Sequence, residues 1–169
     1  MIDLDKKEII LWGEETDKAL KFATELANKK FQFWSDRDKT LTLDKTIENL
    51  YRGKCGEIAA YRYLVAKNHK VSEVDFVIHD FVDHDADLVV IGHGIELHVK
   101  TCLRDFTSWL FEKDARYVCN PTNHDFNCFV QQIEADVYKI VSIKPSKDCK
   151  YEKTLKHMPS KVCVNENTL

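Results

Sequence analysis

The chain has 169 residues, 44% of them hydrophobic, and a formal net charge of −3. This length and apolar content are typical of a single domain, here residues 1–169, that buries a sizeable core. The weak negative charge excludes a protein that is basic throughout, so any nucleic-acid-binding surface must come from local clusters of positive charge.

The N-terminal segment and the cysteines indicate the cellular compartment. The apolar run within residues 1–15 is too short for a secretory signal or a membrane span. The six cysteines contain no CxxC pair, and their irregular spacing favours reduced thiols. We therefore expect a cytoplasmic protein.

Helices are expected in the first part of the chain, over about residues 1–67. In residues 16–31 the apolar side chains recur on one stripe, and Thr16 is a suitable N-cap. The polar residues 35–40 predict a loop, after which Asp44 is a candidate N-cap for a second helix.

A third helix is predicted over residues 57–67. Gly53 and Gly56 are expected to loosen or kink the chain just before it. Glu57 lies at its first turn, on the same face as the residues at i+3, i+4 and i+7, which are Ala60, Tyr61 and Leu64. The Glu57 carboxylate is therefore predicted to lie on the inward-facing side.

Strands are expected over about residues 71–143, and helices followed by strands indicate a mixed α/β (α+β) fold. Residues 87–100 have the signature of a β-hairpin, because an apolar run, a turn with two glycines and an alternating strand follow one another. Residues 144–169 are predicted to be a polar, basic and solvated tail with lysines spaced by three. The other candidate strands are residues 71–78, 107–111, 116–119, 125–133 and 137–143.

The second strand of this hairpin carries Glu96, His98 and Lys100 on one face, because strand side chains alternate. A buried strand rarely presents three ionisable groups in a row, so this face is either solvated or a functional site. Asp85 and Asp87 lie at the mouth of the partner strand. Carboxylate, imidazole and ammonium groups could therefore converge on one spot, which suits a divalent metal ion and a bound water.

Three stretches resemble motifs of the PD-(D/E)XK nuclease superfamily. GKCGEIAAYRYL offers Glu57 on a helix, DADLVV offers Asp87, and LHVKT offers Lys100. The resemblance covers roughly residues 53–101, and His98 departs from it, since the family usually has Glu, Asp or Gln two residues before the lysine. It implies a restriction-endonuclease-like core, a central mixed sheet flanked by helices, and cleavage of DNA with Mg²⁺ or Mn²⁺.

The resemblance and the chemistry of phosphodiester hydrolysis together assign a role to each residue. Asp87, His98 and Lys100 would be catalytic, with Glu57 in support. The metal ligands would be the Val99 carbonyl and the side chains of Glu57, Asp87 and His98. His98 could instead act as a base toward a bound water. The alternative carboxylates are Asp85 and Glu96, and the candidate contacts to DNA phosphates are Arg52, Lys54, Arg104, Lys113 and Arg116.

These residues predict an endonuclease of the restriction, phage or homing type. A domain of this size offers one active site, so cleavage of both DNA strands requires a homodimer or a higher homo-oligomer. One alternative is a nuclease that acts on RNA or on DNA junctions. The other is a catalytically impaired DNA-binding or interaction module of the same fold, for which His98 in place of an acidic residue is the motivating observation.

Overall fold

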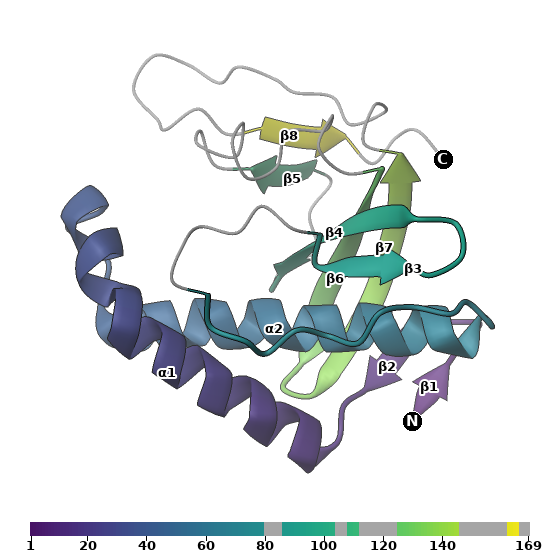
Figure 1. The fold of residues 1–169 in the computed structure, drawn as a ribbon, viewed down its shortest axis with the longest axis horizontal. Helices are drawn as coiled ribbons and strands as arrows, with labels where there is room; N and C mark the ends of the chain where they lie inside the picture. Colours follow the sequence, from purple (N-terminus) through teal and green to yellow (C-terminus); the bar gives the residue numbers. More distant parts are fainter. Residues whose placement is uncertain (80–85, 104–107, 112–124, 146–161, 166–169) are drawn as a thin grey trace.

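The computed structural model describes residues 1–79, 86–103, 108–111, 125–145 and 162–165. It contains two helices, α1 and α2, in the N-terminal part and strands on both sides of them in the chain (Figure 1). In chain order the elements are β1 (Ile2–Asp3), β2 (Glu8–Ile10), α1 (Gly13–Arg37), α2 (Leu43–Ala66), β3 (Leu88–Val90), β4 (Ile95–Cys102), β5 (Ser108–Phe111), β6 (Phe126–Glu134), β7 (Val137–Pro145) and β8 (Val162–Asn165).

The main sheet has six strands in the order β1-β2-β7-β6-β4-β3. Strands β4 and β6 are parallel, and the other neighbouring pairs are antiparallel. Strands β5 and β8 pair in a separate two-stranded sheet. Helix α2 packs against the curled main sheet, and α1 packs against α2 (Figure 1). The predicted mixed α/β architecture is confirmed at this level.

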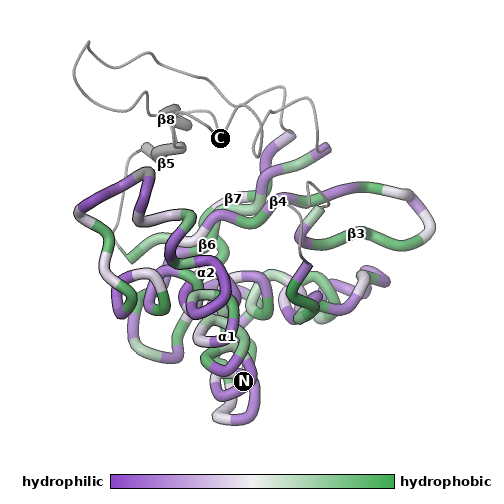
Figure 2. The backbone as a smooth tube through the Cα atoms, turned by 60° about the vertical axis from the view of Figure 1, so that its left-hand side comes forward, coloured by the Kyte–Doolittle hydropathy of each residue, from purple (hydrophilic) through white to green (hydrophobic). Residues whose placement is uncertain are grey.

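The core lies between α2 and one face of the main sheet. Helix α2 contributes Cys55, Ile58 and Ala59, and the sheet contributes apolar side chains from β3, β4, β6 and β7. Burying a side chain the size of Val or Leu contributes about 1.5–3 kcal/mol. Figure 2 shows hydrophobic and hydrophilic residues alternating along both helices, as expected of helices that bury one side.

Helix α1 is longer than predicted at both ends. It begins at Gly13, because the Glu15 carboxylate accepts the Trp12 N–H at 2.8 Å and closes a cap there, so Thr16 is not the N-cap. It continues to Arg37, and the predicted loop over 35–40 is therefore half helical.

Helix α2 is continuous from Leu43 to Ala66, so the predicted break before residue 57 is wrong. Its N-cap is Thr42, whose side chain accepts the Lys45 N–H at 3.2 Å, and not Asp44.

Gly56 serves close packing and does not kink the helix. A Cβ atom at this position would lie 1.8 Å from Thr101 Oγ1 on β4. Gly53 has open space at the corresponding point, with no atom within 4 Å. Helix α2 therefore approaches β4 directly at Gly56, and any side chain there would push the two elements apart.

Both predicted hairpins are confirmed, as β3–β4 and β6–β7. The β3–β4 turn contains Gly92 and Gly94 with φ values of 95° and 63°, which L side chains rarely adopt. The candidate strand at 107–111 corresponds to β5, and the one at 116–119 lies outside the described residues.

Residues 71–79 do not form the predicted strand. Apart from one bridge between Val71 and Val90, they run back along α2 (Figure 1). The Asp75 carbonyl accepts a hydrogen bond from the Lys54 side chain, and the Phe76 ring packs edge-on against Phe22 of α1. Contacts to the helices therefore replace sheet pairing in this segment.

Two further expectations need correction. Strand β7 continues to Pro145, and Lys144 is buried within it, so the solvated tail does not begin at residue 144. Pairing with β6 continues up to Pro145 and outweighs the lysine spacing. Strands β1, β2 and β8 were not predicted, since two of them have only two or three residues and β8 lies in the expected tail.

Within the described residues, neither helix combines the length and apolar composition needed to cross a lipid bilayer. Cys55, Cys102 and Cys128 are in the thiol form. Cytoplasmic localisation and the extent of the domain stay predictions.

The close approach at Gly56 predicts opposite effects of one substitution at two positions of α2. Gly56→Ala should lower the free energy of unfolding by about 1–3 kcal/mol, because the new methyl group overlaps Thr101. Gly53→Ala should raise it by about 0.5–1 kcal/mol, because alanine favours helix and meets no neighbour. Urea denaturation measures both, and equal effects of the two substitutions would contradict the close approach.

Candidate functional site

The candidate site is arranged around Asp87, which directly precedes β3. Its Oδ2 atom accepts the Val99 N–H at 2.6 Å and lies 2.9 Å from His98 Nδ1. Leu88 pairs with Leu97, so Asp87 lies across from His98 in the hairpin register. The side chain of His98 is 8% exposed and that of Asp87 is 24% exposed. The carboxylate is thus held by the main chain of β4 and faces the imidazole.

The surroundings of Asp87 favour its ionised form. Burial acts to raise its pKa, but the His98 imidazole, the Val99 N–H and the charge of Lys100 together lower it below the usual value. Asp87 is therefore a carboxylate at neutral pH, and His98 Nδ1 faces it at 2.9 Å.

The polar face of β4 is arranged as predicted. Leu97 and Val99 belong to the core cluster beside α2, so Glu96, His98 and Lys100 lie on the opposite face. Glu96 is exposed at the start of the strand, Lys100 is half-buried, and His98 is buried between them. The alternative carboxylate Glu96 is thus at the exposed end of this row.

Glu57 comes to the site from α2 and is bound by a lysine. Lys54 Nζ lies 2.5 Å from Glu57 Oε2, donates to the Asp75 carbonyl at 2.9 Å, and lies 4.6 Å from the centre of the Phe22 ring. Both side chains of this ion pair are largely buried. Lys54, predicted as a DNA contact, therefore holds Glu57 and the segment 71–79 in place.

Glu57 belongs to the same electrostatic group as Asp87 and His98. Burial and, to a lesser extent, the charge of Asp87 raise the pKa of Glu57 to about 8, although Lys54 and His98 act to lower it. Four residues predicted from three separate stretches, Glu57, Asp87, His98 and Lys100, are thus close enough to influence one another's charges.

These residues do not form a complete metal shell. In the part of the chain that is described, no group of three or more His, Cys, Asp or Glu side chains is placed to hold a metal ion. The Val99 carbonyl, a predicted metal ligand, lies on the same strand edge as its N–H and therefore toward Asp87. The carboxylate of Glu57, another predicted ligand, is bound by Lys54 instead. Binding of Mg²⁺ or Mn²⁺ stays a prediction.

Of the remaining predicted residues, the structure describes Arg52. Arg52 is largely buried and bonds to Glu48, Asn49 and Gln132, so its guanidinium is engaged within the protein. Its contact with DNA stays a prediction. The predicted residues that lie outside the described ranges are Asp85, Arg104, Lys113 and Arg116.

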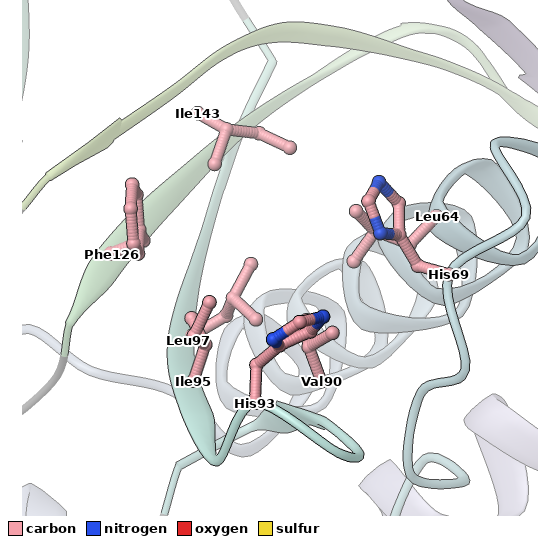
Figure 3. A pocket seen from close by; sticks show the side chains of 8 residues that line it. All are labelled: Leu64, His69, Val90, His93, Ile95, Leu97, Phe126 and Ile143. Carbon is pink, nitrogen blue, oxygen red and sulfur yellow. The ribbon is translucent and has the colours of Figure 1, made fainter.

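A separate pocket of about 360 Å³ lies on the other side of β4. Apolar side chains of α2, the β3–β4 hairpin, β6 and β7 line it together with the imidazoles of His69 and His93 (Figure 3). Leu97 lines this pocket, and its neighbour His98 points to the opposite face of the strand. The pocket therefore contributes no side chain to the candidate site.

Two residues in register with His98 across β6 and β7 were not predicted from the sequence. Asn127 on β6 pairs in register with His98, and Lys144 on β7 pairs with Asn127. The alternation of Asn127 with Phe126 and Cys128 could have placed it on the polar face. Its position next to His98 depends on the register of two parallel strands, which no local pattern contains.

Comparison with protein-family models, with curated proteins and with solved structures finds no match for this chain. The function of the site is therefore argued from its own chemistry.

The raised pKa of Glu57 predicts a pH dependence of stability. As pH rises from the usual pKa of 4.5 to about 8, the unfolded chain releases this proton before the folded protein does, so this group lowers the free energy of unfolding over that range. Glu57→Gln removes this contribution. The stability of the Gln variant relative to wild type should therefore increase between pH 5 and pH 9, as measured by urea denaturation.

The control for this experiment is Glu25→Gln, which changes an exposed carboxylate on α1. Its stability relative to wild type should change less with pH than that of Glu57→Gln. A Glu57→Gln variant whose relative stability did not change with pH would show that the carboxyl is not buried as described.

Proposed function

We propose that this chain is a nuclease that hydrolyses DNA phosphodiester bonds and has a restriction-endonuclease-like core. The observation that carries the proposal is the Asp87 carboxylate, shared between the Val99 N–H and His98 Nδ1, with Lys100 and Glu57 in the same electrostatic group. The order of a helix with Glu57, then the β3–β4 hairpin with Asp87 and Lys100, also agrees with the resemblance.

Asp87 gives His98 the form that a general base requires. In the proposed mechanism the proton of neutral His98 lies on Nδ1, the nitrogen 2.9 Å from the carboxylate, so that Nε2 carries the lone pair and takes a proton from an attacking water. The water oxygen bonds to phosphorus as the bond to the leaving alkoxide breaks, and solvent returns a proton to that alkoxide. General-base catalysis of this kind contributes about 10²–10⁴-fold.

Lys100 supplies positive charge on the same face as His98. It lies two residues along the strand, and it already acts on the charge of Asp87. In the transition state it would offset negative charge on the phosphoryl oxygens, which is the largest demand in phosphoryl transfer.

The proposal includes dependence on Mg²⁺ or Mn²⁺, which the resemblance implies. It also includes a homodimer or higher homo-oligomer and cytoplasmic localisation, which are predicted from the sequence. A bound Mg²⁺ or Mn²⁺ ion would add charge stabilisation to that of Lys100. A homodimer would place one site on each DNA strand, and a cytoplasmic nuclease would have access to DNA.

A second candidate function is a DNA-binding module without catalysis. The pairing of Glu57 with Lys54, and His98 in the position of an acidic residue, favour it. Binding of DNA without turnover would distinguish this module from the enzyme.

Nicking of supercoiled plasmid tests the proposed function. Wild type should nick or linearise the plasmid in Mg²⁺ or Mn²⁺, with an EDTA reaction to measure metal dependence. Asp87→Asn and Lys100→Met should each reduce the rate by about 10²-fold or more. Lys139→Met, which removes an exposed lysine from β7, is the matched control and should keep wild-type activity.

Equal activity in wild type and Asp87→Asn would show that the cleavage does not come from this site. DNA binding without cleavage under all three conditions would favour the module.

A further inference from the structure

The pocket of about 360 Å³ beside α2 and the β3–β4 hairpin has the size and lining of a small-molecule site. Such sites usually measure about 300–1,000 Å³ and are mostly apolar, with a few polar groups. Ile95, Phe126 and Ile143 line the pocket and are only half-buried. A ligand with an apolar body would remove their surface from water, which favours binding.

Two imidazoles line the same pocket, and a backbone hydrogen bond joins the segments that carry them. The Ile91 N–H donates to the Lys70 carbonyl at 2.7 Å, one residue after His69 and two residues before His93. Figure 3 shows both rings among the lining side chains. An imidazole has at least one N–H donor in either protonation state. The pocket thus combines an apolar lining with hydrogen-bond donors.

His69 takes a position that serves apolar packing in many helix ends. Asn68 has a positive φ of 64°, and the His69 N–H donates to the Leu64 carbonyl at 3.0 Å, as in a Schellman motif. In that motif the residues corresponding to His69 and Leu64 frequently make a hydrophobic contact. Both line the pocket here. The imidazole therefore supplies a donor where an apolar side chain would serve packing alone.

The charges around His69 favour an acidic ligand. Lys67 and Lys70 flank it in the chain, and both are exposed. Among the described residues, the pocket lining contains no carboxylate. Asp125, just before β6, has its carboxylate on the Glu96 N–H at 2.9 Å. A carboxylate on a ligand would therefore meet N–H donors and positive charge.

We propose that this pocket binds a small organic acid with an apolar body, of the class of medium-chain carboxylic acids. The imidazoles of His69 and His93 donate hydrogen bonds to its carboxylate, and its apolar body lies against the half-buried lining. Leu97 faces this pocket, whereas His98 points to the opposite face of β4. The site is therefore separate from the proposed nuclease site and does not depend on that function.

Methyl NMR spectra of the full chain, titrated with octanoate, test the site. Octanoate should cause saturable shifts at the methyl groups of Val90, Leu97 and Ile143, which line the pocket, and none at Ile9 of β2. Acetate, which has the charge without the apolar body, should cause none. Octan-1-ol should bind at the same methyl groups about fivefold more weakly or less, because hydrogen bonds to a charged group are the stronger ones.

Histidine variants test recognition of the carboxylate. His69→Leu and His93→Leu should each weaken octanoate binding about fivefold and leave octan-1-ol binding no weaker. Both side chains are exposed, so these variants should fold. His79→Leu, at an exposed histidine that does not line the pocket, is the matched control and should keep wild-type affinity for both compounds.

A second pair of variants tests the apolar part of the pocket. Ile143→Trp should weaken octanoate binding about tenfold, because the larger ring fills the space, and Ile133→Trp, exposed on β6, should not. Circular dichroism identifies the folded variants, and the histidine variants provide the reading if Ile143→Trp does not fold.

Two results would overturn the inference. One is the absence of saturable octanoate shifts at the pocket methyl groups of wild type. The other is wild-type octanoate affinity in both His69→Leu and His93→Leu. Plasmid nicking is measured separately, so failure of the nuclease proposal and failure of this inference are distinguishable.

Discussion

The Asp87 carboxylate is the contact on which the candidate site depends. Strand β3 begins one residue later, at Leu88, so at this point Asp87 takes the position of a strand partner and accepts the Val99 N–H. The same oxygen lies against His98 Nδ1. One side chain therefore accepts a main-chain hydrogen bond of β4 and faces the imidazole, so the end of the hairpin is both a structural contact and the centre of the candidate site.

Strand β4 has one face in the core and the other in the candidate site. Its apolar face presses against α2, where Gly56 lets the helix approach Thr101 directly. Its other face carries the row of ionisable groups. Glu57 links the two sides, because it is part of α2, is bound by Lys54, and still responds to the charge of Asp87. Shifting α2 would therefore change both the core and the electrostatics of the site.

Local patterns in the sequence were enough to predict the hairpins and the polar face of β4, since strand alternation needs only neighbouring residues. They failed where a partner distant in the chain decides the outcome. From the sequence, Gly56 was predicted to break the helix, whereas in the structure it lets Thr101 lie against α2. From the sequence, Lys144 was assigned to a charged tail and Asn127 to an ordinary strand position, but the strand register places Asn127 beside His98 and Lys144 beside Asn127. Long-range pairing, which sequence periodicity does not contain, accounts for these differences.

The central claim is that Asp87 holds His98 as a base with its proton on Nδ1. Nitrogen-15 spectra of histidine-labelled protein at neutral pH test it most directly, with His98 assigned by its loss in His98→Gln. We expect a proton on Nδ1 in wild type and loss of that preference in Asp87→Asn. A neutral His98 that carries its proton on Nε2 in wild type, with the same spectrum in Asp87→Asn, would contradict it.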